Sequence, residues 1–76
     1  MYSEIVKIRL IQERTNAGYS QRDLAKHTGI SNITIAKIEA GTRKPDIDTV
    51  GTLAEFYDIS VDWLFGIGKK TKDGNT

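Results

Sequence analysis

Apolar residues recur along the chain at helical spacing, in short segments that glycines separate. Single glycines stand at positions 18, 29, 41 and 66, each just after one of these segments. Glycine suits the residue after a helix because it adopts the left-handed conformation without a Cβ clash. No segment alternates apolar and polar residues with the β-branched and aromatic content typical of a strand. The pattern therefore predicts an all-α fold.

One device for starting a helix occurs three times. A serine follows a bulky apolar residue and precedes a second apolar residue by four positions. Apolar groups on either side of a capping serine form a hydrophobic staple, which sets how the chain enters a helix. The three sets are Tyr19, Ser20 and Leu24; Ile30, Ser31 and Ile35; and Ile59, Ser60 and Leu64.

These signals predict five helices in a compact bundle. The sole proline, Pro45, precedes the fourth of them, where it removes no helical hydrogen bond. The expected helices are Ser3–Asn16, Ser20–His27, Ser31–Ala40, Asp46–Tyr57 and Ser60–Phe65. Residues 1–66 then form one domain, and residues 67–76 form a polar tail that we expect to be flexible and disordered.

The length and composition restrict the class of protein. Seventy-six residues, of which 38% are hydrophobic and 28% charged, suffice for one small domain. The absence of cysteine excludes disulfides, thiolate metal sites and a cysteine nucleophile. No apolar run approaches the roughly 18 residues of a membrane helix, and no signal peptide is visible at the N-terminus. We therefore expect a cytoplasmic protein with no membrane partner.

The second and third expected helices form the most informative pair. A short turn that contains Gly29 lets two helices cross steeply, as in a helix-turn-helix. Ala25 would lie at the crossing, where a larger side chain would separate the helices. Ile35 and Ile38 would hold the third helix against the core. Its opposite face would then point outward, with Asn32, Ile33, Thr34, Ala36 and Lys37 on it.

These positions resemble a known family. The matching residues are Ser20-Gln21, Leu24-Ala25, Thr28-Gly29-Ile30-Ser31, Ile35-Ala36-Lys37-Ile38-Glu39-Ala40-Gly41 and Val61-Asp62-Trp63-Leu64. They are similar to the helix-turn-helix domains of lambdoid phage repressors and Cro proteins. The family extends to Xre-type regulators of bacteria and prophages, to restriction-modification controller proteins and to some antitoxins. The resemblance covers about Val6 to Phe65 without an insertion.

The resemblance implies a five-helix bundle whose third helix enters the major groove of double-stranded DNA. It also implies a salt bridge between Arg14 and Glu39 that is structural and joins the first and third helices. The base-reading positions that it implies are Asn32, Ile33 and Lys37, with Thr34 beside them. The expected phosphate contacts are Gln21, Arg22, Ser31, Thr42, Arg43 and Lys44.

Side-chain chemistry agrees with the implied base contacts. Asn32 is able to bond adenine N6 and N7, and Lys37 is able to donate to guanine O6 and N7. Ile33 either contacts a thymine methyl or packs on the second helix, and Thr34 reaches either a base or a phosphate. Gln21 has the alternative of being a solvated first-turn residue. Arg43 and Lys44 also suit the negative end of the third helix.

The titratable residues indicate no catalytic or metal site. His27 is the only histidine, and it lacks a nucleophile or acidic neighbour in the pattern. Asp46, Asp48 and Asp62 are best interpreted as caps and first-turn carboxylates of helices, and Asp58 falls in a turn. No phosphate-cradling glycine loop or metal-ligand spacing occurs. We expect no enzyme, no cofactor, no metal and no small-molecule ligand.

The net charge of +1 conceals an uneven distribution. Residues 20–45 carry five basic and two acidic groups, whereas residues 46–66 carry five acidic groups and no basic one. A basic helix-turn-helix next to an acidic pair of helices would present one end to DNA.

Double-stranded DNA is therefore the expected partner. We expect a homodimer that forms through the C-terminal helices and binds a palindromic operator. The predicted function is that of a phage- or prophage-type repressor acting at the nucleoid of a bacterial cell or phage-infected host. Restriction-modification controllers and antitoxins would read DNA in the same way. A helical protein-interaction module is the alternative of a different class, but its face should be rich in aromatics or methionine.

Overall fold

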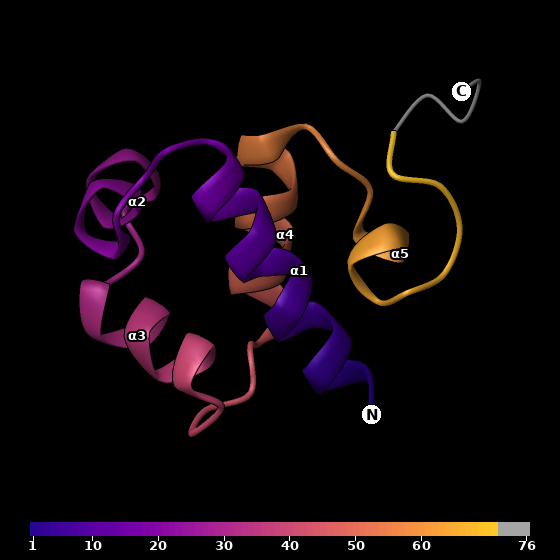
Figure 1. Ribbon diagram of the computed structural model, residues 1–76, viewed down its shortest axis with the longest axis horizontal. Coiled ribbons are helices and arrows are strands. Elements are labelled where there is room, and N and C mark those ends of the chain that lie inside the picture. The colour runs from indigo at the N-terminus through magenta and orange to yellow at the C-terminus, as the bar shows by residue number, and fades with distance from the viewer. Residues whose placement is uncertain (72–76) are drawn as a thin grey trace.

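The computed structural model describes residues 1–71. The described residues form five helices and no strand, which confirms the all-α prediction (Figure 1). The first helix begins at Tyr2, one residue earlier than expected, and the capping residues of the other four stand just outside the helices. The helices are α1 Tyr2–Asn16, α2 Gln21–Thr28, α3 Asn32–Ala40, α4 Ile47–Tyr57 and α5 Val61–Leu64.

Side-chain caps start four of the five helices. Asp46 Oδ1 accepts the Thr49 N–H at 2.7 Å at the start of α4. At the start of α2, Ser20 Oγ accepts the Asp23 N–H at 3.0 Å, and the Asp23 carboxylate accepts the Ser20 N–H in return. Hydrogen bonds with Ser20 and Thr49 hold the pKa values of Asp23 and Asp46, respectively, below the ordinary value of an aspartate. Ser31 and Ser60 cap α3 and α5.

Left-handed residues end the three middle helices. Gly29 follows α2 with φ of 77° and Gly41 follows α3 with φ of 81°. Asp58 ends α4 with φ of 57°, which an aspartate tolerates better than most residues. The chain therefore turns sharply after α2 and α3 at Gly29 and Gly41, as the pattern of glycines predicts.

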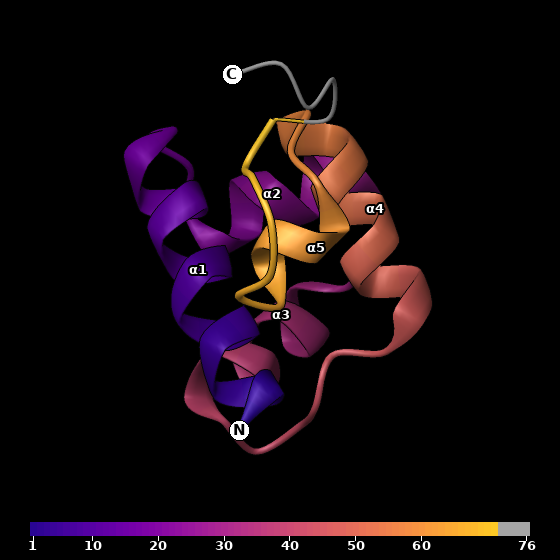
Figure 2. The ribbon, with the colours of Figure 1, turned by 90° about the vertical axis from the view of Figure 1, so that its right-hand side faces the viewer.

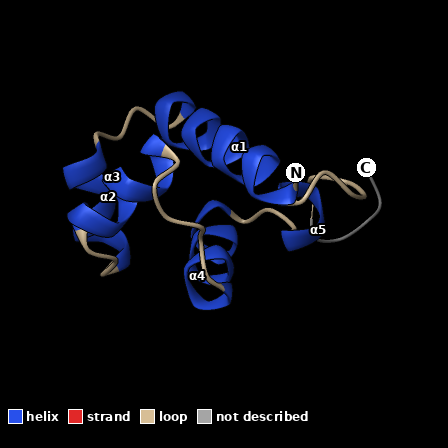
Figure 3. Cartoon of the chain, turned by 90° about the horizontal axis from the view of Figure 1, so that it is seen from below, coloured by secondary structure: helices blue, strands red, loops and turns tan. Residues whose placement is uncertain are grey.

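The core is a single cluster to which every helix contributes. The inner residues of all three staples, Leu24, Ile35 and Leu64, belong to it. Figure 3 shows α2 and α3 together at one end, α5 at the other, and α1 running between them. The buried apolar residues are Val6, Leu10, Leu24, Ile35, Ile38, Val50, Leu53, Ala54, Ile59 and Leu64.

Residues 66–71 fold back over α5 (Figure 2). The Ile67 N–H donates to the Asp62 carbonyl at 2.9 Å, and the Ser60 N–H donates to the Lys70 carbonyl at 2.8 Å. The first five residues of the expected flexible tail thus make defined contacts. The remainder of that tail, residues 72–76, lies outside the described residues.

Two cations from different parts of the chain flank the indole of Trp63. The Arg9 guanidinium lies 4.3 Å from the ring centroid and the Lys70 ammonium 5.0 Å from it. Arg9 also donates to the Trp63 carbonyl, and Lys70 forms an ion pair with Glu13 at 2.9 Å. Lys70, which lies in the expected flexible tail, therefore joins the C-terminal segment to α1. Among the described residues, none of the helices is long and apolar enough to cross a membrane.

Candidate nucleic-acid interface

The outward face of α3 results from the burial of its opposite side. Ile35 and Ile38 lie in the core, so the residues half a turn away point to solvent. Asn32 and Lys37 are exposed there. Ile33 keeps 65% of its surface exposed, so its side chain is not covered by α2. An isoleucine on this face is available to an external partner.

Arg43 lies against one edge of this face. Its Nη1 donates to Thr34 Oγ1 at 3.3 Å, and its Nη2 forms an ion pair with Asp46 Oδ2 at 3.6 Å. Both contacts are solvent-exposed and weak. They nevertheless place a guanidinium next to Thr34, at the side of the residues expected to read bases.

The loop between α3 and α4 is tied to the end of α3. The Lys37 carbonyl accepts the Thr42 N–H at 3.0 Å, the Arg43 N–H at 3.3 Å and the Thr42 hydroxyl at 3.2 Å. Thr42, Arg43 and Lys44 are exposed. The backbone of Lys37 thus holds the loop cations in a fixed place relative to its own side chain.

The start of α2 brings a second group of polar residues to the same region. Arg22 is exposed and Gln21 is half-buried. The Gln21 side-chain amide donates to Glu39 Oε1 at 2.9 Å, a contact that the sequence did not indicate. Ser31, at the start of α3, uses its hydroxyl to accept the Ile33 N–H at 3.1 Å.

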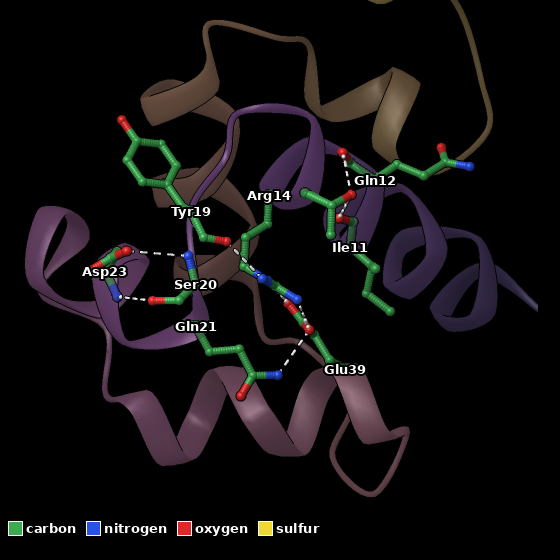
Figure 4. Close-up of polar contacts among 9 residues, drawn as sticks. Ile11, Gln12, Arg14, Tyr19, Ser20, Gln21, Asp23 and Glu39 are labelled. Carbon is green, nitrogen blue, oxygen red and sulfur yellow. Dashed lines mark hydrogen bonds and ion pairs between the residues drawn. The ribbon is translucent and has the colours of Figure 1, made fainter.

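Glu39 is the centre of a network that joins three helices (Figure 4). Arg14 Nε and Nη2 donate to the two carboxylate oxygens of Glu39 at 2.6 Å and 2.8 Å. Arg14 Nη1 donates to the Tyr19 carbonyl at 2.7 Å. The two side chains are only 14% and 10% exposed, and the hydrogen bond to Glu39 raises the pKa of Arg14. With Gln21 added, the network fixes α1, α2 and α3 relative to one another.

Other polar features have structural explanations. Asp48 and Asp62 are first-turn residues of α4 and α5, and Asp46 is an N-cap. His27 stacks with Phe56 at a ring-centroid distance of 6.1 Å and makes a tilted ring contact with Tyr19 at 5.0 Å. Within residues 1–71, no group of three or more histidine or acidic side chains is arranged to hold a metal ion.

Comparison with known proteins identifies the family to which this chain belongs. Residues 10–64 match the family described as helix-turn-helix. The chain belongs to the Xre-type helix-turn-helix family. The matched region contains α2, α3 and the loop that follows α3, and the resemblance seen in the sequence is thereby confirmed.

Members of this family with curated sequences are similar over most of the chain. The HTH-type transcriptional regulator ImmR of Bacillus subtilis (strain 168) is 35% identical over 68 residues, which cover 90% of this chain and 54% of ImmR. The SPbeta prophage-derived uncharacterized HTH-type transcriptional regulator YonR of the same organism is 38% identical, over 74% of this chain and 52% of YonR. The chain thus spans about half the length of these two relatives.

A shorter relative matches nearly end to end. The uncharacterized HTH-type transcriptional regulator MJ0272 of Methanocaldococcus jannaschii is 32% identical over 60 residues, which cover 79% of this chain and 91% of MJ0272. A helix-turn-helix unit of this size therefore also makes up almost the whole of one family member.

Proposed function

We propose that this chain binds double-stranded DNA at specific sequences and acts as a phage- or prophage-type transcriptional repressor. The observation that carries the proposal is the exposed face of α3, with Asn32, Ile33 and Lys37 directed outward from a helix that two isoleucines anchor in the core. Family membership and the similarity to a prophage-derived regulator support it.

In this proposal α3 lies in the major groove and reads base edges. Asn32 pairs with adenine N6 and N7, and Lys37 donates to guanine O6 and N7. Ile33 contacts a thymine methyl, since its exposed side chain has no polar group to offer. Thr34, which accepts a hydrogen bond from Arg43, reaches a base or a phosphate from the edge of the same face.

Phosphate contacts come from both sides of α3. On one side are Arg43 and Lys44 with Thr42, and on the other are the first residues of α2 with Ser31. Gln21 gives one of its side-chain N–H groups to Glu39, so its second amide N–H and its backbone N–H remain for a phosphate. The amino end of α2 suits this role because free N–H groups and the helix dipole both favour an anion. Arg22 adds a positive charge there.

The proposed DNA-binding unit is a homodimer on a palindromic operator. One α3 covers few base pairs, and a two-fold partner would place a second α3 about one DNA turn away. The surfaces of α4 and α5 are the proposed interface, where Val61 is exposed. Tyr57, Trp63 and Phe65 are only partly buried but pack against the core, so they serve the fold as well.

Selection of binding sites from random duplex DNA tests the proposal directly. The expected product is an inverted repeat with half-sites about one helical turn apart. Binding to the selected duplex should weaken steeply as salt rises, because cationic contacts release counterions from phosphates. Failure to enrich any sequence, together with an affinity that stays flat from low to moderate salt, would favour a protein-interaction module instead.

A further inference from the structure

A cavity of about 100 Å³ lies between the amino end of α1 and the loop that follows α3. This volume is well above the roughly 10–15 Å³ that a single water molecule requires. Its polar lining comes from Ser3, Glu4 and Lys7 of α1 and from Arg43 and Lys44 of the loop. Figures 1 and 2 show both segments at the same end of the molecule.

Lys7 reaches across this space toward the end of α3. A Cβ placed on Gly41 would come 3.4 Å from the Lys7 ammonium nitrogen. Lys7 lines the cavity, and its side chain is 27% exposed. Gly41 adopts a φ of 81°, and the Lys7 ammonium group lies beside it.

Charge in the cavity is unbalanced. Lys7, Arg43 and Lys44 line it, whereas Glu4 is the one acidic residue in its lining, at 3.5 Å from Lys7 on an exposed side chain. Arg43 also has a weak, exposed ion pair with Asp46 at 3.6 Å. The N-cap of α1 is Met1, whose side chain makes no capping hydrogen bond. An anion with several acceptor oxygens would satisfy the cations and the Ser3 hydroxyl together.

We propose that this cavity receives a phosphate group of the DNA backbone, bound by Lys7 together with Arg43 and Lys44. The proposal rests on the proposed function, and it extends the DNA contact from the helix-turn-helix to α1. Glu4 competes for Lys7 and Asp46 competes for Arg43, so phosphate entry replaces both of these exposed ion pairs. The same loop that follows the reading helix supplies two of the three cations, which places the cavity beside the proposed course of the DNA strand.

Three matched variants test this site by their effects on duplex affinity. Lys7→Gln should lower the affinity roughly threefold to tenfold at low salt and reduce the salt slope by about one. Glu4→Gln should do the opposite and raise the affinity, because it removes the competing carboxylate. Lys26→Gln removes the same charge from the exposed surface of α2 and is the control, with a smaller effect than Lys7→Gln.

The outcomes separate the possible roles of Lys7. If Lys7→Gln lowers the melting temperature but leaves duplex affinity and salt slope unchanged, Lys7 only compensates the dipole at the end of α3, and the proposal is overturned. Titration of the free chain with inorganic phosphate, followed by the Gly41 amide resonance, distinguishes a site for the free anion from one for DNA. A phosphate-induced shift without any change in duplex affinity of either variant overturns the DNA assignment. If the wild-type chain binds no duplex, the proposed function itself fails, whatever the phosphate titration shows.

Discussion

Lys37 and its neighbour Ile38 show how the two sides of α3 differ: one side packs in the core and the other is free for the proposed DNA contact. Ile38 is buried in the core, whereas the Lys37 side chain is exposed and its carbonyl holds the following loop. Replacement of the side chain therefore leaves the loop contacts in place. A change in DNA binding after such a replacement reports on the lost ammonium group rather than on the fold.

Lys37→Ala should relax the preference at particular base pairs and cost roughly 1–3 kcal/mol of binding free energy. Arg43→Ala is the matched comparison, and it should weaken binding to all sequences alike and reduce the salt slope by about one. Site selection with each variant measures both effects. An unchanged preferred sequence for Lys37→Ala would show that this lysine does not read bases.

Ile33 is tested by removing the methyl group that it is proposed to contact. Substitution of deoxyuridine for thymidine at the relevant operator position should lower wild-type affinity about fourfold, from the free energy of one buried methyl group. The Ile33→Ala variant should bind the two duplexes equally. If both proteins lose the same amount, the methyl acts through DNA shape and not through Ile33.

At the level of elements, the network around Glu39 determines how α1, α2 and α3 are joined. Glu39→Ala should lower the free energy of unfolding by about 3–5 kcal/mol, because Arg14 then loses its partner in a largely buried position. Glu55→Ala removes an exposed carboxylate of α4 and should change stability by less than about 0.5 kcal/mol. Urea unfolding followed by Trp63 fluorescence measures both. Equal stabilities of the two variants would contradict a structural role for the pair.

The cap of α4 predicts a dependence of stability on pH. The Thr49 hydrogen bond lowers the pKa of Asp46 below its ordinary value of 3.8, so the folded state binds a proton less readily than the unfolded chain. Its stabilising contribution is complete above the unfolded pKa and is lost as pH falls through the lowered folded pKa. Asp46→Asn keeps an oxygen acceptor but does not titrate. The free energy of unfolding, measured between about pH 5 and pH 2, should therefore fall less with decreasing pH for Asp46→Asn than for wild type.

Asp48→Asn is the control for this measurement. Asp48 lies in the same first turn of α4 but is not the N-cap. Its replacement should leave more of the acid sensitivity in place than the replacement of Asp46 does. A larger effect at Asp48 would mean that the helix dipole, and not the capping hydrogen bond, dominates the acid response.

At the scale of the whole molecule, charge divides the chain into two unlike ends. Residues 20–45 carry a net charge of +3 and residues 46–66 a net charge of −5. Association through α4 and α5 would bring two acidic surfaces together, so their repulsion opposes the proposed dimer. Salt screens that repulsion, as the Debye length falls from about 10 Å at 0.1 M to about 3 Å at 1 M.

The proposed dimer and DNA binding should consequently respond to salt in opposite directions. Sedimentation equilibrium of the free chain should show stronger self-association as salt rises, while duplex affinity falls. On a selected operator, the complex should contain two chains per duplex. A monomer both free and on DNA would contradict the dimer without affecting the assignment of α3.

The helix starts and ends could be predicted from the sequence because their causes are local. A cap such as Ser20 needs only the backbone a few residues away, and Gly41 needs only a permissive φ. The spacing of Ile35 and Ile38 likewise determined which side of α3 is buried. Fold class, helix order and the exposed face of α3 follow from such short-range patterns.

The tertiary structure decided the contacts between distant residues. Gln21 meets Glu39, Lys7 lines a cavity with Arg43, and Lys70 joins Trp63 and Glu13 only because helix packing brings these segments together. No spacing along the chain encodes those distances, and Lys70 in particular lies in a segment whose polar composition predicts disorder. The sequence by itself thus determined which helices form and which face of α3 is free. The positions of the surrounding charges depended on how those helices pack.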